Sequence, residues 1–203
     1  MIKDFNLIKK INVRIWYFLN RFRFKSIGKK SFIDSPLKIT PLCISLGQNV
    51  RIFKNCRIEG VFSYNNINFN PSIIVGNNVS VQQNLHLTCA NSIVIGKNTA
   101  IASNVTITDI HHQYENIKIP IESQDILVQQ VKIGENCKIY NNSVILPGSK
   151  IGNHVSIGAN SVVAIEIPDY CVVVGAPAKI VKRYNFETKN WDKTNSDGSF
   201  LNL

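Results

Sequence analysis

The sequence predicts an all-β solenoid, a left-handed parallel β-helix of hexapeptide repeats, with an N-terminal amphipathic helix and an excursion loop. Three observations predict it: an aliphatic residue recurs at every sixth position, a small residue follows four positions later, and Gly or Asn stands between them. A period of six belongs neither to an α-helix nor to a simple alternating strand. Repeats of fixed period are typical of solenoids, whose stacked coils share one core.

The longest uninterrupted series covers residues 133–168 and contains six hexads in one phase. Three hexads would close one triangular coil, with the aliphatic side chain inside and the small fifth residue beside it. Gly and Asn near the turns would tolerate left-handed backbone angles. An antiparallel β-sandwich is the alternative, but its strands would recur at roughly 8–12 residues. The first residues of the six hexads are Ile133, Ile139, Ile145, Ile151, Ile157 and Val163.

Earlier segments repeat the pattern in other phases, and each change of phase implies a short insertion at a corner. They begin at Leu46, Val75 and Ile95, and hexads from Ile27 are the earliest candidates. We therefore divide the chain into an N-terminal basic amphipathic helical segment (1–30), a β-helix domain (31–183) and a C-terminal tail (184–203). The last dozen residues of the tail are expected to be disordered.

The net charge of +10 is concentrated at the start of the chain, because residues 1–30 contain nine basic residues and one acid. A nucleic-acid partner is not expected, since the basic character belongs to one segment. Apolar residues recur at helical intervals over residues 2–24, with basic residues on the other faces. Two interpretations are open: peripheral contact of residues 1–24 with an anionic membrane, or packing on the solenoid or a partner subunit. The apolar residues are Ile2, Phe5, Ile8, Ile11, Ile15, Trp16, Leu19 and Phe22.

The five cysteines are an odd number, widely spaced and without a Cys-x-x-Cys pair, so neither a disulfide framework nor a metal cluster is expected. Cys56 and Cys137 fall where the repeat requires a small buried side chain, which favours free core thiols in a reducing compartment. The sequence has no continuous apolar run long enough to span a membrane and no secretory signal. We expect a cytoplasmic location, either free or at the inner face of the membrane.

The repeat stops after Thr108 and resumes near Val131, so about two dozen residues leave the solenoid as an excursion loop (about 108–131). A long insertion in a rigid scaffold is a natural place for function. It opens with His111 and His112 beside Asp109. Transfer of an acyl group from a thioester to a hydroxyl needs a base near the oxygen, and the ordinary pKa of histidine suits that role near neutral pH.

Three features together carry a resemblance: the hexads, the segment Thr108-Asp-Ile-His-His-Gln-Tyr114, and Val174-Gly-Ala-Pro-Ala-Lys179. The chain resembles the hexapeptide-repeat (left-handed β-helix) acyltransferases over about residues 45–183. Within them it resembles the sugar O-acetyltransferases of the galactoside, maltose and surface-polysaccharide type. The resemblance implies acetyl-CoA-dependent O-acetylation of a sugar in O-antigen, capsule or exopolysaccharide biosynthesis. It also implies a homotrimer with its active cleft between subunits, and no required metal.

The same resemblance implies roles for particular residues. Aligned on the His-x-Tyr pattern, the general base is His112; aligned from Thr108, it is His111. The residues implied in acceptor binding are Asn84, Asp109 and Tyr114. The residues implied in coenzyme A binding are Asn141, Ala159, Gly175, Ala176, Pro177, Lys179, Lys182 and Arg183.

The chain departs from its relatives in one coil, where they often show Trp-Ile-Gly and it has Lys138-Ile-Tyr140. The shape of the coenzyme channel is therefore open at that point. Three other functions stay open: N-acetylation of an amino sugar on the same scaffold, a γ-type carbonic anhydrase with a zinc ion, and a non-catalytic solenoid. The adjacent His111 and His112 do not reproduce the ligand spacing of the zinc enzyme.

Overall fold

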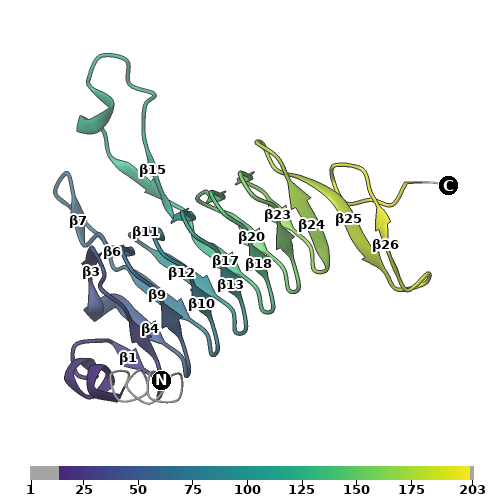
Figure 1. Ribbon diagram of the computed structural model, residues 1–203. Helices are drawn as coiled ribbons and strands as arrows, with labels where there is room; N and C mark the ends of the chain where they lie inside the picture. The colour runs from purple at the N-terminus through teal and green to yellow at the C-terminus, as the bar shows by residue number, and fades with distance from the viewer. Residues whose placement is uncertain (1–13, 202–203) are drawn as a thin grey trace.

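The computed structural model describes residues 14–201, which form a left-handed parallel β-helix with three long sheets along its axis (Figure 1). The predicted fold class is confirmed. Consecutive hexads contribute one strand to each sheet in turn, and every pairing inside the solenoid is parallel and in register. The aliphatic first residues of the hexads meet in columns inside the prism; Ile101, Ile139 and Ile157 are neighbours in one of them.

Sheet A has seven strands: β1 (Ser26–Ile27), β4 (Ile44–Leu46), β9 (Ser72–Val75), β12 (Ser92–Ile95), β17 (Val131–Ile133), β20 (Lys150–Ile151) and β23 (Glu166–Ile167). Sheet B has nine strands: β2 (Phe32–Ile33), β5 (Arg51–Ile52), β10 (Ser80–Val81), β13 (Ala100–Ile101), β18 (Lys138–Ile139), β21 (Ser156–Ile157), β24 (Cys171–Val174), β25 (Lys179–Asn185) and β26 (Asn190–Lys193). Sheet C has six strands: β3 (Lys38–Ile39), β6 (Arg57–Gly60), β11 (His86–Cys89), β14 (Thr106–Thr108), β19 (Val144–Ile145) and β22 (Val162–Val163).

Asparagines make the left-handed turns at two of the three corners. At the A–B corner, between sheets A and B, Asn49, Asn78 and Asn98 have positive φ and are linked side chain to side chain, by bonds of 3.0 and 2.9 Å. Asn is the non-glycine residue that most readily adopts this conformation. The B–C corner, between sheets B and C, is built the same way, so an Asn supplies the turn in most coils. At the A–B corner Lys30, His154 and Tyr170 hold the equivalent position, also with positive φ.

The glycines at the second hexad position have a different role from the one expected. Among the described residues, positive φ at glycine occurs only at Gly148, Gly175 and Gly198. The glycines of the A–B corner are instead required by close stacking of the coils, because a Cβ on Gly134 would lie 2.4 Å from the carbonyl oxygen of Gly152. The hexad glycines therefore set the spacing between coils, and Asn sets the turn.

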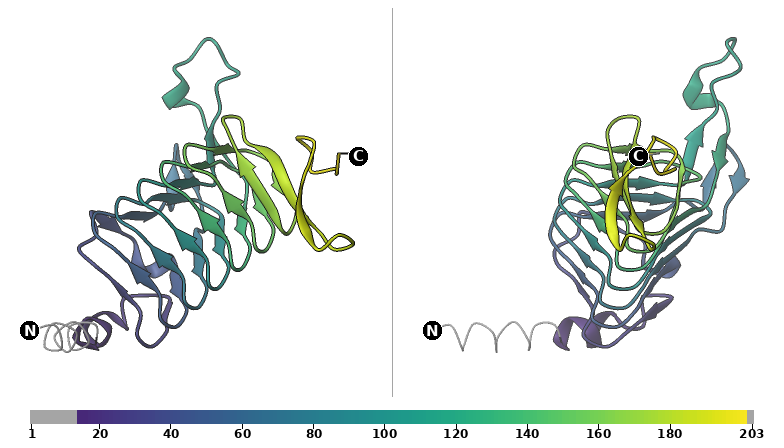
Figure 2. Two further views of the ribbon diagram at one scale, coloured as in Figure 1. Left: turned by 45° about the vertical axis from the view of Figure 1, so that its right-hand side comes forward. Right: turned by 90° about the vertical axis from the view of Figure 1, so that its right-hand side faces the viewer.

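Two excursions leave the solenoid at the C–A corner, where sheet C turns into sheet A, and both project from the same side (Figure 2). The first is a hairpin of β7 (Ser63–Tyr64) and β8 (Ile67–Asn68). The second, at the predicted place, contains β15 (Ile110–His112), the 3-10 turn Ile121–Ser123 and β16 (Ile126–Val128). A further 3-10 turn, Pro41–Cys43, fills this corner in the first coil.

The N-terminal segment is described only from residue 14, so Ile2, Phe5, Ile8 and Ile11 lie outside the described residues. Residues 14–20 are α-helical, and Trp16 packs against Phe24 at the first coil, with ring centroids 5.9 Å apart. Along residues 14–201, no helix has the length and apolarity that a membrane crossing requires.

The C-terminal tail is more ordered than expected. β25 pairs antiparallel with both β24 and β26, and Thr194 bridges to Phe200. The expectation of disorder in the last dozen residues is therefore wrong for those described, up to residue 201. The physical reason is backbone hydrogen bonding: the N–H of Asn195 donates to the carbonyl oxygen of Ser199 at 2.9 Å, and the N–H of Ile180 donates to that of Ser196 at 3.3 Å.

The expectation of free core thiols is confirmed for all five cysteines, which are buried and unpaired. Burial raises the pKa of every one of these thiols. They are consequently poor nucleophiles and serve as small core side chains.

Candidate functional site

The long excursion is anchored at its first residue. Asp109 is fully buried, and its carboxylate accepts hydrogen bonds from the backbone N–H groups of Ala90, Asn91 and Ser92, each at 2.8 Å. The thiol of Cys89 donates to the same carboxylate at 3.3 Å. These donors form the C–A corner of the preceding coil. Asp109 therefore fastens the start of the excursion to the solenoid wall.

This environment assigns Asp109 a different role from the expected contact with the acceptor. Both carboxylate oxygens are already engaged by the corner, and the side chain has no exposed surface. The pattern of an acid beside two histidines is a positioning device in this chain, because the acid fixes the strand that carries them.

β15 runs outward from this anchor and pairs antiparallel with β16, so consecutive side chains point to opposite faces of the ribbon. His112 is half-buried, and its ring meets that of Tyr64 edge-on, with centroids 5.4 Å apart. The Tyr64 hydroxyl donates to the carbonyl oxygen of Glu122 at 2.6 Å and lies 3.5 Å from Nδ1 of His112. An oxygen in this position favours a proton on Nδ1, which leaves Nε2 free to act as a base.

His111 lies on the other face of the same ribbon, opposite Leu127. It is exposed and touches the ring of Tyr114, whose centroid is 5.7 Å away, and Tyr114 is itself exposed. The structure thus brings one pair of predicted residues together, His111 with Tyr114, whereas His112 contacts Tyr64, which lies outside the predicted set. Only His112 is held by a second structural element.

The hairpin that supplies Tyr64 was not anticipated from the sequence. Besides Tyr64, it contributes Asn65, whose side-chain amide donates to the carbonyl oxygen of Gln124 at 2.9 Å. A signal was present: Asn65 and Asn66 both have positive φ, as a two-residue type I′ hairpin turn requires. Asn-Asn between Tyr64 and Ile67 is therefore a recognisable hairpin sequence, which the hexad pattern on either side obscured.

Asn84 lies at the B–C corner, at the opposite end of its sheet C strand from the excursions. It has φ of 63° and begins a side-chain ladder that continues through Asn104 and Asn142 to Asn160, with bonds of 2.8, 3.1 and 3.1 Å. Its position is that of a turn asparagine. It lies at the same corner as the row of residues expected to bind coenzyme A, two coils before Asn141.

That row is contiguous. Asn141 and Ala159 occupy equivalent positions of consecutive coils, since the N–H of Asn160 donates to the carbonyl oxygen of Asn141 at 3.0 Å, and both are exposed. Gly175, Ala176 and Pro177 form the same corner of the last coil and are exposed as well. The carbonyl oxygen of Gly175 accepts from the N–H of Val162 at 3.0 Å. Small side chains thus make the end of this corner a low ridge, here called the B–C ridge (residues 141, 159 and 175–177).

The predicted basic residues follow the ridge on β25. Lys179 and Lys182 are exposed, opposite Val174 and Val172 of β24. Arg183 lies opposite Cys171 on one side and Asp192 on the other, and it is half-buried. Lys179 therefore stands nearest to the ridge, and Arg183 lies farthest along the strand.

Within one chain, His112 and the B–C ridge lie at opposite edges of sheet C. A strand and its turn of five or six residues separate the two corners, which corresponds to about 15–20 Å at the usual rise per residue. Within one chain, His112 and the residues of the B–C ridge therefore do not line one common cleft.

The outer face of sheet C, between the two edges, carries polar side chains. His86 is exposed there, and partial burial together with the neighbouring Arg57 lowers its pKa. Thr88 donates to Thr108 at 3.0 Å, and the N–H of Ile110 donates to the hydroxyl of Thr108 at 3.1 Å. Among residues 14–201 no group of three His, Cys, Asp or Glu side chains is placed to hold a metal ion.

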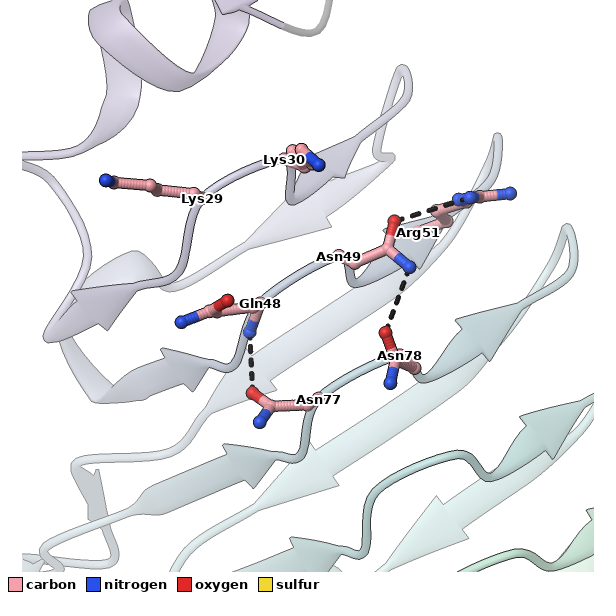
Figure 3. Close-up of a pocket in the computed structure, with 7 residues that line it drawn as sticks. All are labelled: Lys29, Lys30, Gln48, Asn49, Arg51, Asn77 and Asn78. Carbon is pink, nitrogen blue, oxygen red and sulfur yellow. Dashed lines mark hydrogen bonds between the residues drawn. The ribbon is translucent and has the colours of Figure 1, made fainter.

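A separate hollow lies on the A–B corner of the first coils, away from the histidines (Figure 3). It is open, with a volume of about 640 Å³, and its lining is basic and amide-rich. The lining residues are Lys29, Lys30, Gln48, Asn49, Arg51, Asn77 and Asn78.

Comparison with known families decides the nature of the repeat. Residues 130–164 match the family model described as bacterial transferase hexapeptide (six repeats). The chain carries the hexapeptide repeat of the bacterial transferases.

Two curated relatives of this hexapeptide-repeat chain come from Escherichia coli K12. The putative lipopolysaccharide biosynthesis O-acetyl transferase WbbJ is 38% identical over 128 residues, which are 60% of this chain and 65% of WbbJ. The chain thus spans slightly less than two thirds of that relative. Galactoside O-acetyltransferase is 29% identical over 172 residues, 83% of this chain and 68% of the relative.

Solved structures share the fold. The N-acyltransferase AntD from Bacillus cereus, in complex with dTDP and 3-hydroxybutyryl-CoA, superimposes with a TM-score of 0.68 at 23% identity. The match covers 84% of this chain and 88% of AntD. At this identity the likeness establishes a shared fold.

Proposed function

We propose that this protein is an acetyl-CoA-dependent O-acetyltransferase that acts on a sugar in surface-polysaccharide biosynthesis. The observation that carries the proposal is the fixed position of His112. Its strand is anchored by Asp109, and its ring is held by Tyr64 from a second excursion. Similarity to WbbJ and to galactoside O-acetyltransferase supports the acetyl group, the sugar and the hydroxyl acceptor. Acetyl-CoA is a cosubstrate in this reaction, and the proposed chemistry requires no metal.

The proposed reaction has one chemical stage without an acyl-enzyme. Nε2 of His112 removes the proton of the acceptor hydroxyl as its oxygen attacks the thioester carbonyl, and a backbone N–H stabilises the resulting oxyanion. When the carbon–sulfur bond breaks, the protonated imidazole returns the proton to the leaving thiolate. Binding both substrates in one cleft supplies the orientation.

We propose that the active cleft forms between the chains of a homotrimer. The His112 edge and the B–C ridge of one chain face different directions, because they lie at different corners of the prism. A neighbouring chain would supply the ridge, with Asn141, Ala159 and Gly175 along the pantetheine arm and Lys179 and Lys182 near the phosphates. The proposed location is the cytoplasm, at the inner face of the membrane.

Acetyl-CoA binding tests the coenzyme part of the proposal directly. Ala159 is exposed at the centre of the B–C ridge, so an Ala159→Trp side chain should obstruct the pantetheine path and reduce acetyl-CoA affinity at least about fiftyfold. Calorimetric titration of wild type and variant measures this. Ala164→Trp changes another exposed alanine, at the C–A corner after β22; it is the matched control and should bind as wild type does. Wild type without measurable acetyl-CoA affinity would refute the proposal.

N-acetylation of an amino sugar is the second candidate, since it uses the same base and the same coenzyme. Turnover with sugars and their matched amino sugars, followed by NMR of the product, separates the two candidates. O-acetylation is preferred, because WbbJ at 38% identity and galactoside O-acetyltransferase at 29% carry that activity in their names, whereas the N-acyltransferase AntD is 23% identical.

A further inference from the structure

The N-terminal end of the solenoid carries nearly all of the excess charge. Residues 14–58 contain ten basic side chains and one acidic one, Asp34, whereas residues 59–201 contain ten basic and eleven acidic ones. The solenoid is elongated, with its first coils at the end that carries the helix (Figures 1 and 2). The protein is therefore electrostatically polar along its axis, with a cationic N-terminal end.

The described part of the N-terminal helix covers this end incompletely. Trp16 and Phe24 face the first coil, but Phe18, Leu19 and Phe22 leave 61%, 72% and 81% of their surface exposed, and Ile15 leaves 51%. Large apolar side chains at such exposure, gathered on one short segment, are typical of a contact surface. Basic residues border this face: Arg14, Arg21, Arg23 and Lys25.

The basic hollow lies at the same end of the solenoid as the helix. Lys29 and Lys30 lie on the loop that follows β1, and Arg51 lies one coil further (Figure 3). The amides around them bond to one another: Asn49 donates to Asn78, and Asn77 accepts from the N–H of Gln48. Within residues 14–201, Lys29, Lys30 and Arg51 form no ion pair.

Two of these cations, Lys30 and Arg51, stand where the next coil has an uncharged residue. Lys30 has φ of 63° and stands where later coils have Asn49, Asn78 and Asn98, although Lys adopts this conformation less readily than Asn. Arg51 stands where the next coil has Ser80. The first two coils thus depart from the repeat in the direction of positive charge, at the end of the solenoid that carries the exposed apolar face.

We propose that the exposed helix face and the basic hollow together form a docking surface for an anionic lipid bilayer. An amphipathic segment inserts its apolar side chains at the headgroup boundary while basic residues meet lipid phosphates, and both elements occur here at one end of the solenoid. No protein partner is required, because a bilayer supplies both the apolar layer and the dense negative charge.

The docking surface also fixes the distance between the bilayer and the proposed active site. The long excursion leaves the fourth coil, three coil steps from β1, and coils stack about 4.8 Å apart. A bilayer at the N-terminal end would lie about 15 Å below that level. An acceptor sugar carried on a membrane lipid would come within reach of His112. The docking surface rests on the proposed location. Because vesicle binding requires no acetyl transfer, the docking surface and the proposed reaction can be disproved separately.

Co-sedimentation of the full chain with vesicles tests the proposal. Wild type should pellet with vesicles containing phosphatidylglycerol and stay in the supernatant with pure phosphatidylcholine. The variant Lys29→Gln/Lys30→Asn/Arg51→Ser takes at each position the residue of the next coil, so its backbone is preserved. Since each basic residue near an anionic surface contributes about fivefold, this variant should bind about a hundredfold more weakly. Phe18→Ser/Leu19→Ser/Phe22→Ser should lose binding as well.

The matched control removes the same charge elsewhere. Lys97→Gln/Lys132→Gln/Lys150→Gln neutralises three lysines of later coils and should keep wild-type binding. The proposal is overturned if wild type ignores phosphatidylglycerol, or if the hollow variant and the control bind equally. It is also overturned if sedimentation velocity shows that the triple serine variant loses only a contact between copies of the chain while its vesicle binding persists.

Discussion

Replacing His112 by alanine is expected to lower kcat for acetyl transfer by about 10²–10⁴-fold, the usual contribution of a positioned general base. The ring is half-buried and held edge-on by Tyr64, so its loss removes an oriented group and leaves the coenzyme residues untouched. The KM for acetyl-CoA should change little. Release of the coenzyme A thiol, followed at saturating acetyl-CoA, measures the effect.

His111→Ala is the matched control for this prediction. His111 is the adjacent residue of the same strand but points to the other face, and we expect its kcat to stay within about fivefold of wild type. The reverse order of effects would move the base to His111.

Tyr64→Phe keeps the ring and removes the hydroxyl, and it should lower kcat about tenfold with an unchanged KM for acetyl-CoA.

Asp109→Ala is expected to produce the largest loss of stability among substitutions in the excursion. Its carboxylate accepts three backbone hydrogen bonds from the corner of the preceding coil, and the truncation leaves those N–H groups without partners. Hydrogen bonds to charged groups contribute more than neutral ones, so the expected loss is about 3 kcal/mol. For a chain of this size that corresponds to a fall in Tm of about 10 °C, measured by calorimetry.

Asp125→Ala is the control, because Asp125 is an exposed acid of the same excursion. Its free energy of unfolding should change by less than about 0.5 kcal/mol. An Asp109→Ala protein as stable as the Asp125→Ala protein would show that the carboxylate does not hold the corner. Loss of activity without loss of stability would return Asp109 to the role of an acceptor ligand.

The fold could be predicted because the same hexad pattern recurs from coil to coil. Each coil needs one inward aliphatic residue, one small residue and one left-handed turn per hexad, and the register of Ile101, Ile139 and Ile157 follows directly. The excursion was equally visible, since it interrupts a regular period. What the period could not give was the role of each glycine, because close approach between coils depends on stacking in three dimensions.

The candidate site was predictable in its residue types and less so in their roles. Asp109 and Asn84 stand where acceptor ligands would stand in the sequence, yet one is a buried anchor and the other a corner residue. Tyr64 reaches His112 from 48 positions away in the chain, a contact that no local pattern encodes. The separation of His112 from the B–C ridge is likewise a property of the coil and not of the sequence order.

Mixed trimers test the central claim, that His112 of one chain works with the B–C ridge of another. Co-expression of His112→Ala with Ala159→Trp in equal amounts forms sites at random from both chains, and about a quarter of them would combine an intact base with an intact ridge. The account predicts that the mixture recovers about a quarter of wild-type activity while each variant alone has almost none. A mixture as inactive as its components would contradict it.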